Sequence, residues 1–196
     1  MQNSVLYKML IENNASIGEY CVLGRDGYYN DLPTHIGKDG EIGSYVIIEN
    51  NIQIGDNFSI DDYCAIYSGA KIGNNLILCY GKKIYSNSIV GNDCIIGGNI
   101  CERMVLGDRV TFMGEVAHSH YDPTQDWNTT DEPSPMIGTG SVIGVNAIIV
   151  GGITVGENCY VSAGEILRSN LPDNSVFIKN KIYSISSFKG LIKTRY

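Results

Sequence analysis

Aliphatic side chains recur at every sixth residue along much of the chain. The unbroken run consists of Ile42, Ile48, Ile54, Ile60, Ile66, Ile72, Leu78, Ile84, Val90 and Ile96. After two interruptions, the same spacing returns at Ile137, Ile143, Ile149, Val155, Val161 and Leu167. A helix repeats about every 3.6 residues and a strand every two, so a period of six fits neither alone. It predicts short strands stacked as the coils of a parallel β-solenoid.

Glycine follows the aliphatic residue in many of these units, and Asn or Asp often comes next. Examples are Ile54-Gly55-Asp56 and Ile72-Gly73-Asn74. Glycine tolerates the positive φ of a sharp turn, and Asn and Asp are the next best residues there. The fifth place of a unit is repeatedly small or aliphatic. Two inward side chains in every six residues therefore predict a narrow, stacked core.

This pattern resembles the hexapeptide-repeat family, and the resemblance covers roughly residues 17–167. It implies an all-β chain folded as a left-handed parallel β-helix, with three hexads to each triangular coil and about seven coils. Breaks in the period are implied to be external loops. We expect one domain over residues 1–196, a protruding loop at 117–135 and a C-terminal extension at 172–196.

Composition agrees with a single soluble domain. The chain has 196 residues, 23 glycines, five prolines and a net charge of −7, which argues against a nucleic-acid binder. No apolar stretch approaches a transmembrane helix, and the N-terminal residues lack a signal peptide, so we expect a cytoplasmic protein without membrane insertion. Four cysteines, Cys21, Cys64, Cys94 and Cys159, occupy small inward places. Packing therefore explains them better than disulfides or a metal, and no metal is expected.

The period fails in two places, and we expect the chemistry there. One is a slip of four residues around Cys101 to Val105. The other is the long departure at residues 117–135, which contains two of the three histidines, the only tryptophan, four acidic residues and three prolines. A long loop in a tight solenoid is usually functional.

The region from Leu106 to Gly164 resembles the terminal half of sugar acetyltransferases in that family. Pro135-Met136-Ile137-Gly138 matches the restart of the coil after their loop, and Leu171-Pro172-Asp173 matches their exit. The resemblance implies transfer of an acetyl group from acetyl-CoA to a hydroxyl or amine of a sugar, nucleotide sugar or glycan. It also implies a homotrimer with clefts between subunits; polysaccharide biosynthesis is the commonest setting of such relatives.

Two histidines are candidates for the general base in this loop. Counting in sixes from Leu106 and Phe112 places His118 at an inward core position. His120 lies two residues further on, near Asp122, whose carboxylate can hold the imidazole in one tautomer. We therefore favour His120 over His118 as the catalytic base, with Asp122 as its partner. Alternatively, both histidines only cap the loop.

Substrate contacts are assigned from the resemblance and from residue chemistry. The loop offers Trp127 to stack on a sugar and Asp126 and Asn128 to bind its hydroxyl groups. The terminal coils of such acyltransferases hold coenzyme A, which implies a cofactor role for Gly144, Gly151, Ser162, Ala163, Gly164, Lys179 and Lys181. From Val176 onward the chain carries basic residues without an acidic one, which suits phosphates or merely balances an acidic body.

Two other classes share this fold. A carbonic-anhydrase-like metalloprotein should supply three suitably spaced histidines, and this chain offers His118, His120 and the distant His35. A catalytically silent trimeric scaffold would bind no coenzyme A.

Overall fold

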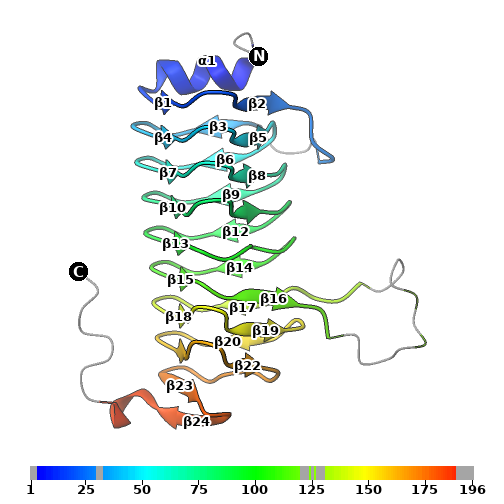
Figure 1. The fold of residues 1–196 in the computed structure, drawn as a ribbon, viewed down its shortest axis with the longest axis vertical. Helices are drawn as coiled ribbons and strands as arrows, with labels where there is room; N and C mark the ends of the chain where they lie inside the picture. Colours follow the sequence, from blue (N-terminus) through cyan, green and yellow to red (C-terminus); the bar gives the residue numbers. More distant parts are fainter. Residues whose placement is uncertain (1–3, 30–32, 120–123, 125, 127–130, 189–196) are drawn as a thin grey trace.

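The computed structural model describes residues 4–29, 33–119, 124, 126 and 131–188. Parallel strands stack in a column along the long axis of the molecule (Figure 1). Each coil passes in turn through three faces, which we call the first, second and third face. The first corner joins the first face to the second, and the second corner joins the second face to the third. This is the parallel β-helix that the six-residue period predicts.

The first face is a sheet of ten strands. In spatial order they are β1 (Ser16–Ile17), β4 (Glu41–Ile42), β7 (Ser59–Ile60), β10 (Ile77–Leu78), β13 (Ile95–Ile96), β15 (Thr111–Phe112), β18 (Val142–Ile143), β21 (Tyr160–Val161), β23 (Ser175–Ile178) and β24 (Lys181–Ser184). All neighbours are parallel except β23 and β24, which form an antiparallel pair at the C-terminal end.

The second face consists of two sheets in line. The first contains β2 (Val22–Arg25), β5 (Ile47–Glu49), β8 (Ala65–Ile66) and β11 (Lys83–Ile84), and the second contains β16 (Glu115–Ala117), β19 (Ile148–Val150) and β22 (Ile166–Leu167). An isolated bridge from Ile84 to Ile100 extends the first of them by one coil.

The third face is a sheet of seven strands. They are β3 (His35–Ile36), β6 (Gln53–Ile54), β9 (Lys71–Ile72), β12 (Ile89–Val90), β14 (Val105–Leu106), β17 (Met136–Ile137) and β20 (Thr154–Val155). A bridge from Val155 to Leu171 continues this face toward the C-terminus.

The core is the column of residues predicted from the period. On the first face Ile42 pairs with Ile60 and Ile60 with Leu78, and these three side chains are at most 4% exposed. The column continues past Leu167 to Leu171 and Phe177, which are also buried. Burial of stacked aliphatic side chains stabilises each coil against its neighbours.

A short helix closes the N-terminal end of this column. Helix α1 (Val5–Glu12) begins after Ser4, whose hydroxyl accepts a hydrogen bond from the backbone N–H of Tyr7. This satisfies one of the backbone donors left unpaired at a helix start. Leu6 and Leu10 are fully buried on the first coil. A single 3₁₀ turn, η1 (Ile185–Ser187), follows β24 at the other end.

Two corrections to the predicted register concern the first corner. The step from face to face takes four residues instead of six from Ile96 to Ile100 and again from Phe112 to Val116. The first slip thus lies between Ile96 and Ile100 instead of around Cys101 to Val105. The second makes Val116 the residue that pairs with buried Ile149, so the prediction of an inward His118 is wrong.

Close backbone packing explains both shortened corners. A Cβ on Gly98 would collide with the carbonyl oxygen of Gly114 in the next coil, and one on Gly114 would collide with that of Ala147. Glycine permits this approach because it lacks the Cβ atom. The count of six misplaces the first shortening and misses the second, since the deleted residues belong to the turn and not to the inward positions.

The cysteines behave mostly as predicted. Cys64, Cys94 and Cys159 are at most 1% exposed in the core, whereas Cys21 is only half-buried. Burial raises the pKa of the Cys94 thiol to about 11. Such thiols act as small apolar residues and are poor nucleophiles at neutral pH.

Candidate functional site

Two excursions leave the solenoid at the second corner. We call residues 25–29 the strap and residues 117–135 the arm. Figure 1 shows that both depart on the same side of the column, the strap between β2 and β3 and the arm between β16 and β17. A corner carries only turn residues, so an insertion there lengthens the loop without disturbing the stacked strands.

At the base of the arm, His118 meets Glu132. The imidazole Nδ1 lies 2.9 Å from the Glu132 carboxylate, although the two residues come from the two ends of the arm. The His118 side chain is 65% exposed, whereas that of Glu132 is 12% exposed. A carboxylate against Nδ1 favours the tautomer with the proton on Nδ1, which makes Nε2 the basic nitrogen.

Ser119 and Gly151 fix the position of Glu132. The Ser119 backbone N–H donates to the carboxylate at 2.9 Å, and its hydroxyl donates to the same group. Partial burial would raise the pKa of the Glu132 carboxyl, but the hydrogen bonds from Ser119 and His118 outweigh it, and the net pKa is lowered. Gly151, at φ +73°, leaves space beside the carboxylate, since a Cβ would approach it to 3.1 Å.

The turn that contains Glu102 and Arg103, one coil nearer the N-terminus, contacts the end of the arm that returns to the solenoid. Arg103 forms an ion pair with Asp131 at 2.7 Å and also reaches the Glu132 carbonyl oxygen at 3.5 Å. The Ser134 hydroxyl donates to the Glu102 carbonyl oxygen at 2.5 Å. These contacts act on the segment that contains Glu132. The turn therefore helps to position Glu132, the partner of His118.

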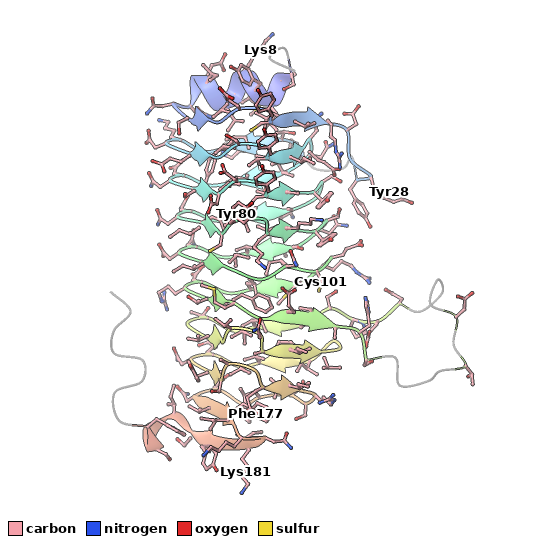
Figure 2. All side chains as sticks on the ribbon, viewed as in Figure 1. Lys8, Tyr28, Tyr80, Cys101, Phe177 and Lys181 are labelled. Atoms are coloured by element: carbon pink, nitrogen blue, oxygen red, sulfur yellow. The ribbon has the colours of Figure 1, made fainter. Side chains whose placement is uncertain are left out.

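The strap reaches this same turn. The Tyr29 hydroxyl donates to the Glu102 carboxylate at 2.6 Å, and the Tyr29 backbone N–H donates to the Ser68 hydroxyl at 3.1 Å. The hydrogen bond to Glu102 raises the pKa of the Tyr29 hydroxyl, because ionisation would lose the donor and place two negative charges together. Tyr28 projects outward on the side of the arm (Figure 2) and packs edge-to-face on Tyr29.

A buried carboxylate anchors the start of the strap. Glu49 is 6% exposed, forms an ion pair with Arg25 at 2.9 Å and accepts from the Ser68 backbone N–H at 2.9 Å. Gly27 lies so close that a Cβ would collide with Glu49 and Ser68. The strap is thus seated on the solenoid by at least three independent contacts.

Most of the residues expected to bind the cofactor gather at the first corner, in the C-terminal coils. Gly144 packs against Ala163, and the Glu165 carboxylate accepts from the backbone N–H groups of Lys179 and Asn180 at 2.6 and 3.0 Å. Ser162 and Gly164 belong to the same turn as Ala163, and Lys181 follows in β24 (Figure 2). Gly151 stands apart, at the second corner beside the arm.

Several predicted site residues lie outside the described residues. His120, Asp122, Trp127 and Asn128 are in this group, so their roles stay predictions. Asp126 is described and is exposed. Within residues 4–29, 33–119, 124, 126 and 131–188, no group of three or more His, Cys, Asp or Glu could hold a metal ion. Nor does that part of the chain contain a helix suited to crossing a membrane.

Reasoning from the sequence offered Glu132 only as a contact for the sugar and missed its pairing with His118. It also missed Arg103 and Tyr29. The sequence did contain a signal for the pairing of Glu132 with His118. Glu132 lies just before the Pro135 restart, so the chain at Glu132 must come back to the corner from which His118 departs. Arg103 and Tyr29 had none. Their contacts join segments that are distant in the chain, and only the coil register brings those segments together.

No protein-family model matches the chain. Among curated proteins, it is 33% identical over 73 residues to the "Bifunctional protein GlmU" of Thermosynechococcus vestitus, a match covering 37% of this chain and 15% of that protein.

The solved structures similar to the chain include three acyltransferases. A GDP-perosamine N-acetyltransferase mutant of Caulobacter crescentus, in complex with CoA and GDP-perosamine, is 19% identical with a TM-score of 0.43, covering 78% of this chain and 57% of that one. The UDP-N-acetylglucosamine acyltransferase of Campylobacter jejuni is 14% identical with a TM-score of 0.47, covering 86% and 71%. AntD, an N-acyltransferase of Bacillus cereus in complex with dTDP and coenzyme A, is 16% identical with a TM-score of 0.41, covering 90% and 85%.

Proposed function

We propose that this chain transfers an acetyl group from acetyl-CoA to a hydroxyl or amine of a sugar, nucleotide sugar or glycan, with His118 as the general base. The observation that carries the proposal is the pair formed by His118 Nδ1 and Glu132 at 2.9 Å, at the exposed base of the arm. A carboxylate-oriented imidazole that solvent can reach is suited to accept a proton from a substrate. The complexes of similar acyltransferases with CoA support the choice of donor.

The proposed reaction is a direct transfer from coenzyme A to the acceptor, with no covalent intermediate on the enzyme. Nε2 of His118 accepts the proton of the acceptor hydroxyl or amine while the acceptor oxygen or nitrogen attacks the thioester carbon. The C–S bond then breaks, and the leaving coenzyme A thiolate receives this proton from the imidazolium. Glu132 stabilises the transient positive charge on the imidazolium ring through Nδ1–H.

The outer surface of the second face offers a path for the cofactor. It runs from the first corner, with Ala163, Lys179 and Lys181, to the second corner, with His118. Ile166 is 38% exposed on this surface and can contact the apolar part of the cofactor arm. The exposed ammonium groups of Lys179 and Lys181 suit its phosphates. Gly144, Gly151, Ser162 and Gly164 complete the proposed cofactor set.

The acceptor belongs on the arm. Trp127, Asp126 and Asn128 are its proposed contacts, and His120 with Asp122 is the alternative catalytic pair. We place the complete site between the subunits of a homotrimer, because a convex solenoid surface has too few walls to enclose two substrates. Polysaccharide modification in the cytoplasm is the proposed setting.

A thiol-release assay tests this proposal. The protein is incubated with acetyl-CoA and a panel of sugars and nucleotide sugars, and His118→Ala and His120→Ala are assayed separately. We expect His118→Ala to lower turnover by about 10²- to 10⁴-fold. Full turnover in both variants would eliminate the loop base. A protein that forms trimers but binds no coenzyme A would instead be a silent scaffold.

A further inference from the structure

Four tyrosines form a column at the first corner of the N-terminal coils. Tyr20 stacks on Tyr45 with ring centroids 5.1 Å apart, Tyr45 on Tyr63 at 4.8 Å, and Tyr63 contacts Tyr80 at 5.5 Å in a tilted arrangement. All four are exposed, by 69%, 46%, 51% and 60% in that order. Tyr80 marks the C-terminal end of the column (Figure 2). Because the rings stack on successive coils, their flat faces point toward the two ends of the solenoid.

The backbone at these tyrosines is unusual. Tyr20, Tyr45 and Tyr63 have φ angles of +59°, +59° and +62°, a left-handed conformation that is rare for bulky residues. At the equivalent turn of other coils, the chain uses Gly81, Asn146 and Gly164, which adopt positive φ easily. Aromatic residues thus occupy positions whose positive φ favours glycine or asparagine, which points to a functional role for their rings.

The outermost ring of the column faces a pocket. One face of Tyr20 is covered by Tyr45, so its other face points toward the N-terminal end, where α1 lies. A pocket of about 490 Å³ opens there, lined by Tyr7 of α1 and by Ile17, Gly18, Glu19, Tyr20, Cys21 and Leu23 of the first coil. Helix α1 has eight residues and is about 12 Å long. It covers the core through Leu6 and Leu10, and its Tyr7 lines one side of the pocket.

The lining sets the chemistry of a ligand. The face of Tyr20 and the side chains of Ile17 and Leu23 offer an apolar surface, while the exposed Glu19 carboxylate and the Tyr7 hydroxyl offer polar groups. Glu19 is the sole charged residue in the described lining, which disfavours a phosphate or a carboxylate ligand. A pocket of this size suits a ligand of one or two rings. A pyranose combines an apolar CH face with a rim of hydroxyl groups that can donate to a carboxylate.

We propose that this pocket binds a pyranose ring, stacked on the open face of Tyr20 and hydrogen-bonded to Glu19 and Tyr7. The ligand continues the tyrosine column by one ring. This site is at the N-terminal end of the solenoid, several coils from His118, and it does not depend on acetyl transfer.

Ligand-observed NMR on the full chain tests the proposal, with methyl β-D-glucopyranoside, glucosamine and phenol as probes. Tyr20→Asn removes the ring and keeps a residue suited to positive φ, as Asn57 and Asn75 show at +56° and +59°. Tyr63→Asn makes the same change within the column, away from the pocket, and is the matched control. Circular dichroism melting checks the fold of both variants.

We expect both sugars to bind the unaltered protein saturably. Tyr20→Asn should weaken binding by roughly tenfold or more, because the stacking surface is lost, and Tyr63→Asn by less than about twofold. Glu19→Gln gives a second test that leaves the rings in place, and it should weaken glucosamine more than the neutral glycoside. The proposal is overturned if neither sugar binds, if only phenol binds, or if Tyr20→Asn and Glu19→Gln both bind like the unaltered protein.

Discussion

The hydroxyl of Tyr29 lies 2.6 Å from the carboxylate of Glu102, a residue 73 positions later in the chain. Glu102 precedes Arg103, and Arg103 pairs with Asp131 beside Glu132. The strap of the first coil is thereby connected to the pair of His118 and Glu132 through a short series of polar contacts.

Loss of the Tyr29 hydroxyl should loosen the arm. In Tyr29→Phe the ring remains but Glu102 loses its donor, so we expect amide hydrogen exchange in residues 131–136 to rise by roughly threefold to tenfold. Tyr28→Phe removes an exposed hydroxyl from the same strap and is the control. Equal exchange in both variants would show that the strap does not hold the arm. This measurement is independent of catalysis.

Replacement of Glu132 by Gln should impair turnover more than cofactor binding. The amide cannot stabilise the imidazolium as a carboxylate does, so we expect kcat to fall by roughly 10- to 100-fold, while the KM for acetyl-CoA changes little. Glu157→Gln, an exposed residue of the solenoid, is the control. Steady-state thiol release measures both constants, and an unchanged kcat would remove Glu132 from the mechanism.

The pH dependence of the arm follows from the lowered pKa of Glu132. A carboxyl whose pKa is lower in the folded state stabilises that state above its ordinary pKa of about 4.3. This contribution is lost as the pH falls through the lowered pKa. An NMR titration of the Glu132 side-chain carbon should therefore give a midpoint below that of the unfolded chain. A raised midpoint would contradict the contacts with Ser119 and His118.

Two thiols with raised pKa values, buried Cys94 and half-buried Cys101, should resist alkylation. Burial raises the pKa of both Cys94 and Cys101 to about 11, so at pH 8 only about one thiol in a thousand is ionised. We expect mass spectrometry after brief iodoacetamide treatment at pH 8 to find both unmodified in the folded protein and modified in urea. Rapid labelling of either without denaturant would contradict the raised pKa values of these two thiols.

Gly98→Ala should destabilise the solenoid. Its Cβ would collide with the Gly114 carbonyl oxygen, and such overpacking costs about 1–3 kcal/mol. Gly81→Asn is the control, since Gly81 has φ +71° with no heavy atom within 4 Å of an added Cβ. Urea unfolding compares the two variants. A stable Gly98→Ala protein would mean that the shortened corner can widen.

The six-residue period predicts more of the fold than of the site. It identifies the inward column from Ile42 to Leu167 because each coil places chemically similar side chains at the same height, and burial demands aliphatic ones. It misplaces the four-residue corner at Gly98 and does not detect the one at Gly114, where backbone contact between coils replaces turn residues. That omission is why His118 is wrongly predicted to lie inside the core.

The amino-acid order alone determined the repeating unit, the buried column and the place where the chain departs from it, because these follow from local periodicity. Only the tertiary structure decided that His118 meets Glu132 and that Tyr29 reaches Glu102. Those pairs depend on which coils lie next to each other at one corner, and stacking brings together residues that no short segment of sequence connects.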